Sequence, residues 1–195
     1  MKGVLWREGL FLRPHHLQQF GIGVQGSIAR LAAQGRTHPW GVVALDVDPL
    51  KLEQGAFDVR RLEVAFPSGE VAVLGGEGGS NARVESKEIP KTSDSTLTVY
   101  VGIRRLREQE PNVGEVGKDE FDPPRYVRNV VRVADLTNGR NLQDVELMEL
   151  NVRLFFEGDR TDGFETVPIA RLEAPAVGLP LTRLSRTFAP PSLRV

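Results

Sequence analysis

The feature that most constrains the fold of this chain is a change in the period of its apolar residues after Pro39. Beyond that proline, apolar and polar residues alternate with a period of two, which is typical of half-buried β-strands. In the segment 96–106, TLTVYVGIRRL, this alternation places Leu97, Val99, Val101 and Ile103 on one face. The same pattern occurs at 43–47, 62–66, 71–73, 125–136, 146–156 and 165–173, with a hairpin turn predicted at 67–70. No helical segments separate these strands, so they predict an antiparallel β-sandwich.

Two of these segments break the simple pattern. In 146–156 the apolar residues shift from odd positions, such as Leu147, to even positions, such as Leu150. A shift of this kind usually indicates a β-bulge or a break between two strands. In 165–173, Pro168 has no N–H to donate to a strand ladder, which predicts that its strand lies at a sheet edge.

The residues before Pro39 instead predict one α-helix. Pro14 suits its first turn, and Gly35 suits its C-terminal end. One apolar stripe with a period of 3.6 follows from the spacing of Leu17, Phe20, Val24, Ile28 and Leu31. Gly21, Gly23 and Gly26 lie inside this helix, each at a cost of about 1 kcal/mol relative to alanine. They indicate a bend, fraying, or close packing against the helix backbone.

The predicted fold class is therefore mainly β: an antiparallel β-sandwich preceded by one N-terminal α-helix. With 195 residues the chain is long enough for one domain with its own hydrophobic core. We expect this domain to span 1–185, with an N-terminal docking segment and the helix at 1–35. A diproline at 190–191 stiffens the chain, so we expect 186–195 to be a linker toward a further domain.

Composition excludes several classes of function. The formal net charge is −1, with acidic and basic residues interleaved, so the sequence predicts no nucleic-acid partner. Arg7, Glu8 and Arg13 interrupt the apolar residues of the N-terminus, and no signal-peptide core is found there. Nowhere is there an apolar run of about 18 residues, so no direct membrane insertion is predicted. We expect the protein to be cytoplasmic, in keeping with its lack of cysteine.

The sequence offers no complete metal site. Glu8, His15 and His16 could be ligands, but adjacent histidines diverge by about 100° on a helix. The third histidine, His38, lies roughly 30 Å away if the helix is straight. We therefore expect no metal and no cofactor, and we interpret His15 and His16 as surface or interface residues.

Nor does the sequence contain a recognisable reaction centre. The glycine-rich 75–80 lacks the Lys and Ser/Thr of a phosphate-binding loop, and no G-x-S-x-G pattern occurs. The carboxylates of Asp119, Glu120 and Asp122 lie in a polar loop, where they are expected to be solvated. We therefore predict that the protein is not an enzyme.

The N-terminal segment 6–20, WREGLFLRPHHLQQF, is unusually rich in amphipathic residues. Trp6, Phe11 and their apolar neighbours are suited to anchoring an interface, because aromatic side chains lose little entropy for the area they bury. Two interpretations follow. The aromatics either fix this segment against the sandwich of the same chain, or they dock it to another chain.

The same segment resembles a known family signature. Trp6, Glu8, Gly9, Phe11, Leu12, Pro14, His16 and Gln18 form a pattern similar to the N-terminal motif of TssK, the trimeric baseplate subunit of bacterial type VI secretion systems. The later motifs Pro168–Leu172 (PIARL) and Phe188–Pro191 (FAPP) also resemble that family. The chain departs from it at His15, where the family more often has glutamine, and at Leu17, where it more often has an aromatic residue.

This resemblance implies a non-catalytic structural function. It implies a shoulder domain similar to that of siphophage receptor-binding proteins, which docks onto the TssF–TssG wedge of the baseplate. It also implies that the linker 186–195 leads to a helical domain and that the protein is a homotrimer. Further C-terminal domains would link it to the membrane-complex proteins TssM and TssL, at the cytoplasmic face of the inner membrane. On this basis the predicted partner-binding residues are Trp6, Glu8, Phe11, Leu12, Pro14, His15, His16 and Gln18.

A carbohydrate-binding or accessory β-sandwich module is the alternative function. Such modules usually expose a row of tryptophan or tyrosine side chains. The chain has only two residues of each type, namely Trp6, Trp40, Tyr100 and Tyr126, which disfavours this alternative.

Overall fold

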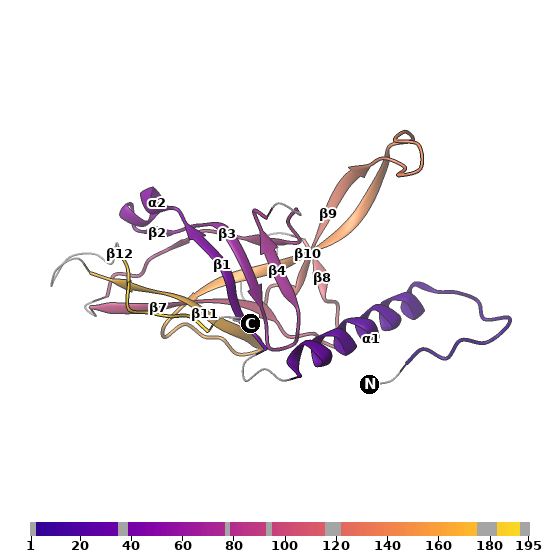
Figure 1. Cartoon of the computed structure of the whole chain (residues 1–195), viewed down its shortest axis with the longest axis horizontal. Coiled ribbons are helices and arrows are strands. Elements are labelled where there is room, and N and C mark those ends of the chain that lie inside the picture. Colours follow the sequence, from indigo (N-terminus) through magenta and orange to yellow (C-terminus); the bar gives the residue numbers. More distant parts are fainter. Residues whose placement is uncertain are drawn as a thin grey trace.

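The computed structural model describes residues 3–34, 39–76, 79–92, 95–115, 122–174 and 183–191. It shows helix α1 (Pro14–Ala33) at the N-terminus, followed by a body made of β-sheets (Figure 1). This confirms the predicted mainly β fold with one N-terminal helix. The predicted helix end at Gly35, the histidine His38, and the loop carboxylates Asp119 and Glu120 lie outside the described residues.

The described strands form two main sheets and one small ribbon. The first sheet has the order β1-β3-β4, with strands β1 (Gly41–Val47), β3 (Val59–Ala65) and β4 (Val71–Leu74). The second has the order β12-β11-β7-β10-β9-β8, and β5 (Ala82–Val84) pairs with β10 beside this path. Its strands are β7 (Thr96–Arg104), β8 (Val113–Gly114), β9 (Tyr126–Val133), β10 (Gln143–Phe156), β11 (Phe164–Glu173) and β12 (Arg183–Leu184). The ribbon joins β2 (Ala56–Phe57) to β6 (Lys87–Glu88), and a short helix α2 (Pro49–Glu53) precedes it.

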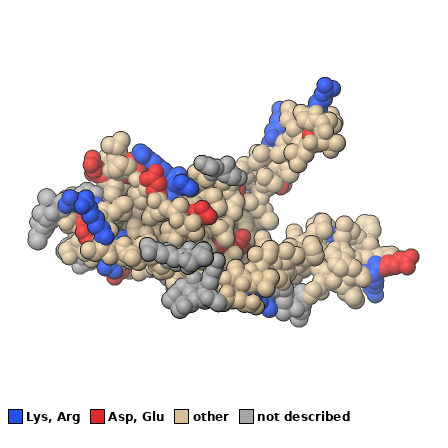
Figure 2. All heavy atoms as spheres, viewed as in Figure 1, with Lys and Arg blue, Asp and Glu red and all other residues tan. Residues whose placement is uncertain are grey.

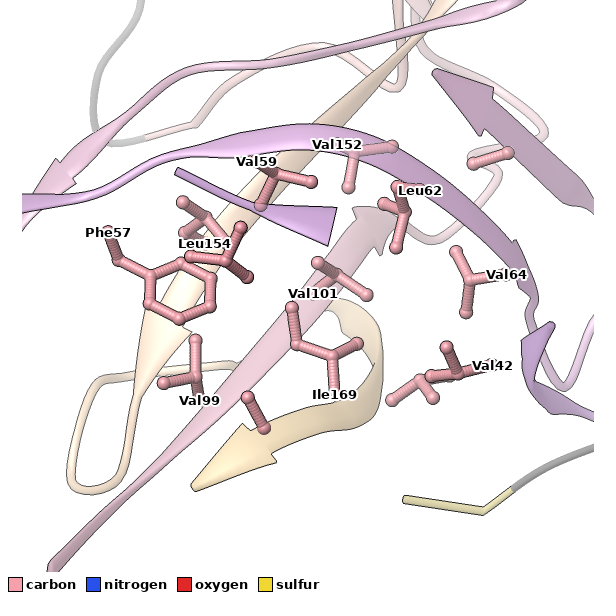
Figure 3. Close-up of a cluster of buried hydrophobic side chains, with 14 of the residues drawn as sticks. Val42, Phe57, Val59, Leu62, Val64, Val99, Val101, Val152, Leu154 and Ile169 are labelled. Atoms are coloured by element: carbon pink, nitrogen blue, oxygen red, sulfur yellow. The ribbon is translucent and has the colours of Figure 1, made fainter. Parts of the chain in front are cut away.

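The hydrophobic core lies between the two main sheets. Figure 3 shows side chains from both sheets pointing toward one another, with Val64 on one side and Val101 and Ile169 on the other. The predicted inward face of β7 is confirmed, because Leu97, Val99, Val101 and Ile103 are all buried. The predicted hairpin turn is also found: the Gly69 N–H donates to the Phe66 carbonyl, and the Phe66 N–H donates to the Glu70 carbonyl, at 2.8 Å each.

Strand β10 differs from its prediction. The shift in its apolar positions indicated a bulge or a break, but Gln143–Phe156 is one continuous strand of 14 residues. The shift marks a change of partner instead. Residues up to Leu150 pair with β9, and residues from Arg153 onward pair with β7 inside the sandwich. The apolar side chains before and after the shift therefore face different surroundings.

Two smaller irregularities concern strand edges. The register of β1 against β3 shifts between Val42 and Ala44, so Val42 is buried and Val43 points to solvent, against the simple alternation. Pro168 on β11 pairs with Tyr100 of β7 and is followed by another register shift. On its other side β11 meets β12 only at Leu172 and Glu173, so among the described residues Pro168 does lie on an open edge.

The last described residues lie against the sandwich. The Val42 N–H donates to the carbonyl of Pro191 at 2.7 Å, and the guanidinium of Arg171 lies 5.1 Å from the ring centre of Phe188. These contacts involve part of the expected linker 186–195. The domain boundary at residue 185 stays a prediction.

Candidate docking surface

The N-terminal segment turns back alongside α1. The Leu10 N–H donates to the Arg7 carbonyl at 3.2 Å, which closes a tight turn. Gly9 has a φ of 75° in this turn, a conformation that glycine adopts without steric cost. Figure 1 shows that the segment and α1 together form one projection beside the sandwich. We call this projection, residues 3–33, the N-terminal lobe.

The two parts of the lobe are held together by aromatic contacts and a helix cap. The ring of Trp6 lies 6.2 Å from that of Phe20 in an edge-to-face arrangement and 6.4 Å from that of His16. His16 also accepts a hydrogen bond on Nδ1 from the backbone N–H of Arg13, at 3.0 Å. This bond satisfies a donor at the helix start, in the manner of a capping box. His16 therefore has a structural function that sequence reasoning did not assign to it.

Most of the predicted partner-binding residues are exposed on this lobe. Trp6 is 50%, Leu12 53% and Phe11 80% exposed. Glu8, Pro14, His15 and Gln18 are exposed as well, and His16 is half-buried. The structure thus brings the eight residues together on one projection. Because Trp6 packs on α1 and the lobe stands beside the sandwich, the aromatics do not fix the segment to the sandwich core.

The helix itself turns its small residues toward the sandwich. An ideal Cβ placed on Gly69, in the β3–β4 turn, would lie only 2.1 Å from the Cβ of Ala29, so the two backbones approach closely there. At 100° per residue, Val24 lies about 140° around the helix from Ala29. The apolar stripe Leu17, Phe20, Val24, Ile28 and Leu31 accordingly faces outward, with exposed fractions from 42% to 66%. No residue of α1 is buried, and at Gly21 nothing approaches within 4 Å.

A cleft of about 1160 Å³ lies between residues 22–28 of α1 and the sandwich. Gln25, Gly26 and Ile28 line it from the helix, and Ile28 is the stripe residue closest in angle to Ala29. Glu70, Tyr126 and Glu165 line it from the sheets. At its base lies a cluster of buried charges that sequence reasoning missed, centred on Arg125.

Arg125 connects the two sheets at this end of the sandwich. It is 3% exposed and donates to the carboxylate of Glu70 at 3.0 Å and to that of Glu165 at 3.1 Å. Glu165 in turn accepts from the backbone N–H of Ser68 at 2.9 Å, in the turn that carries Gly69. The cluster therefore fixes the turn on which α1 rests. No local sequence signal marks it, since Glu70 and Glu165 are 55 and 40 residues from Arg125.

The cluster also raises the pKa values of two of its members, Arg125 and Tyr126. Burial opposes the charged form of Arg125, but hydrogen bonds to Tyr126 and Glu70 outweigh it and raise the pKa of the guanidinium. Burial raises the pKa of the Tyr126 hydroxyl, which donates to Glu70 at 3.2 Å. Both groups therefore keep their protons at neutral pH, and the cluster acts as a fixed ionic contact between the sheets.

Metal ligands, membrane-spanning helices and exposed aromatic rows are the features that other functions would require. Among them, no three His, Asp or Glu side chains lie close enough together to hold a metal ion. The helices within the described ranges are too short or too polar to cross a membrane. Trp40 packs against the core and the Tyr126 hydroxyl is bonded within the ionic cluster, so these aromatics do not form an exposed row with Trp6.

Comparisons with known proteins give a consistent result. A family model described as "Bacterial Type VI secretion", with the member names EvfL, ImpJ and VasE, matches residues 16–195. A curated relative from Pseudomonas aeruginosa, the type VI secretion system baseplate component TssK1, is 27% identical over 197 residues that cover 98% of this chain and 42% of the relative.

Solved structures share the fold. A TssK–TssF–TssG baseplate subcomplex contains a chain with a TM-score of 0.81 and 25% identity, over 98% of this chain and 62% of that chain. A type VI baseplate complex gives a TM-score of 0.83 and 25% identity, over 98% and 60%. A crystal structure of TssK gives 0.80 and 23% identity, over 97% and 42%, which supports the fold alone. The chain thus spans between about two fifths and three fifths of the length of these relatives.

Proposed function

This chain belongs to the bacterial type VI secretion family whose model matches residues 16–195, and from this membership we propose that it is the shoulder part of a TssK-type baseplate subunit. Its N-terminal lobe docks onto a wedge made of TssF and TssG. The relative solved in the TssK–TssF–TssG subcomplex supports this proposal, since its matching region has the same fold. The function is mechanical linkage, and no step of it requires catalysis.

The observation that carries this proposal is the exposure of large apolar side chains on a preformed lobe. Phe11 is 80% exposed and Trp6 50% exposed. Exposed aromatics held in place before binding lose little further entropy on binding, which is why such residues dominate many interfaces. Trp6 is already ordered by Phe20 and His16, so it is suited to enter a pocket on the partner.

The proposal extends to the assembled protein. We expect self-association as a homotrimer, in which linked copies raise the effective concentration at the next wedge site, so each contact can be modest. We expect TssM and TssL of the membrane complex to be reached through parts of the protein beyond this chain. This arrangement places the protein at the cytoplasmic face of the inner membrane.

The test is co-purification with TssF and TssG from the same genome, using the Trp6→Ala/Phe11→Ala double variant. Loss of two interface anchors at about 2 kcal/mol or more each predicts a complex that is weaker by about 700-fold or more. The control is Leu50→Ala, which removes an apolar side chain of similar exposure, 63%, from helix α2. This variant should bind normally.

Thermal unfolding separates the two explanations for a loss of binding. If the double variant keeps its melting temperature and loses the wedge, the lobe is the docking surface. Full binding by the folded double variant would contradict the proposal. A double variant that unfolds would show that Trp6 and Phe11 belong to the core of the protein, and it would contradict the assignment equally.

A further inference from the structure

A second projection of the molecule is an isolated two-stranded ribbon. Strands β9 and β10 pair in antiparallel register from Tyr126 opposite Leu150 to Val133 opposite Gln143, and Figure 1 shows this hairpin leaving the sandwich. We call residues 127–149 the arm. Strand β8 pairs with β9 only at Tyr126 and Val127, and β5 meets β10 only from Leu150 onward. Along most of its length the arm has no third strand among the described residues.

An arm of this kind needs a covering surface. A two-stranded hairpin with both faces in water is at best marginally stable, because it buries too little apolar surface to offset the entropy of ordering its backbone. The paired part of the arm nevertheless runs as regular strand to Val133, near its tip. This suggests that one of its faces is covered in the assembled protein.

The two faces of the arm differ in chemistry. Directly opposed residues share a face, and one face contains the pairs Val131–Val145, Asn129–Leu147 and Val133–Gln143. On the opposite face Arg128 bonds Glu146 at 2.7 Å, and Arg132 lies 3.8 Å from Asp144. We call Val131, Val133, Val145 and Leu147 the arm face. Leu147 is 45% exposed, and nothing in the arm itself covers it further.

The helix stripe is the matching surface on the same chain. Leu17 and Leu31 are 14 positions apart on α1, or about 21 Å, and the arm from Val127 to Val133 is about 20 Å long. Within α1, Arg30 is the only lysine, arginine or acidic residue. Figure 2 shows the lobe as largely uncharged except toward its outer end. The four apolar residues of the arm face can therefore join the stripe at little cost of removing charges from water. Glu149 is the charged residue on that side of the paired strands, and it lies at the base of the arm, where it accepts a hydrogen bond from Asn129.

The two surfaces do not meet within one copy of the chain. In Figure 1 the arm and the lobe leave the body in diverging directions, and their outer ends are far apart. We propose that the arm face of one copy packs on the helix stripe of a second copy. This inference rests on the self-association part of the proposed function, and its test requires no wedge protein.

The contact has a consequence for the assembly. It joins two different surfaces, so each copy offers one arm and one stripe, and the contact is heterologous. Heterologous contacts use every surface only when the assembly closes into a ring. The arm and the stripe thus provide what a cyclic oligomer requires, and a homotrimer is such an oligomer.

Cysteine cross-linking tests the contact directly, because this chain contains no cysteine of its own. Two copies of the complete gene product would be produced with different affinity tags. One copy would carry Leu147→Cys and the other Val24→Cys. Under mild oxidation we expect a disulfide between the two tags. The control copy carries Met148→Cys, which is the adjacent and more exposed position, at 59%, on the opposite face of the arm. We expect the Leu147→Cys pair to give at least tenfold more cross-linked product than the Met148→Cys pair.

Three results would overturn the inference: equal yields for the two pairs, a disulfide only within one chain when both cysteines are on the same copy, or a monomeric mass by light scattering. A cross-link from Leu147→Cys to a TssF or TssG protein in place of a second copy would also overturn it. Melting temperatures of the single variants guard against misfolding. Since this assay needs no wedge protein, its failure is distinguishable from failure of wedge docking.

Discussion

The sandwich and its two projections use similar sequence patterns for opposite purposes. In β7, alternating residues such as Val99 and Val101 are completely buried between two sheets. In the arm, the alternating residues Val145 and Leu147 remain exposed, as does the apolar stripe of α1. The comparison teaches that apolar periodicity specifies which residues share a face, while the number of layers around an element decides whether that face is covered within the chain.

The first prediction contrasts two phenylalanines. Phe57 is completely buried in the core, and Phe11 is 80% exposed on the N-terminal lobe. Phe57→Ala should lower the free energy of unfolding by about 3–5 kcal/mol, because it removes buried contacts and leaves a cavity. Phe11→Ala should change it by less than about 0.5 kcal/mol. Urea unfolding followed by circular dichroism measures both values, and similar losses for the two variants would break the comparison.

The second prediction contrasts two arginines that each form ion pairs. Arg125 is buried and holds Glu70 and Glu165, whereas Arg128 lies on the arm and pairs with Glu146, with side chains 52% and 64% exposed. Arg125→Met should cost about 3 kcal/mol, since it leaves two carboxylates near the core without their cation. Arg128→Met should cost about 0–1 kcal/mol, because water already screens the pair. The same unfolding assay applies, and a large loss in Arg128→Met alone would show that the arm contributes to the stability of the sandwich.

Sequence reasoning succeeded where neighbours along one strand determine the outcome. The inward face of β7, the turn at Gly69 and the start of α1 at Pro14 all follow from local patterns of apolar, glycine and proline residues. It failed where distant segments decide. The continuity of β10 depends on its exchange of β9 for β7 as partner, and the burial of Val42 in place of Val43 depends on a register shift against β3.

The candidate site shows the same limit. The motif from Trp6 to Gln18 could be recognised in the sequence, and the structure places these residues on one lobe. The direction of the helix stripe could not be predicted, because it follows from the contact of Ala29 with Gly69 across the β3–β4 turn. Arg125 carries no local signal either, since its partners come from two other strand regions.

The third prediction concerns Gly69, where the β3–β4 turn of the sandwich contacts α1 of the N-terminal lobe. Gly69 and Gly55 both have a φ of 85°, so alanine at either position carries the same backbone strain, about 1 kcal/mol. At Gly55 nothing lies within 4 Å of the added Cβ, whereas at Gly69 it meets Ala29 of α1. Both variants should therefore lose similar stability in the sandwich, but only Gly69→Ala should displace the lobe. Hydrogen exchange of α1 amides measures this displacement.

For Gly69→Ala we expect faster exchange in α1 with unchanged protection in β3 and β7, because the sandwich core does not depend on the helix for its burial. Gly55→Ala should leave exchange in α1 as it is in the unaltered protein. Equal exchange of α1 in both variants would mean that the lobe is held by something other than the Ala29 contact. The Gly69→Ala variant also sharpens the functional argument. If the lobe docks as a preformed unit, displacing it from the sandwich should weaken wedge binding, although every residue of the lobe is intact.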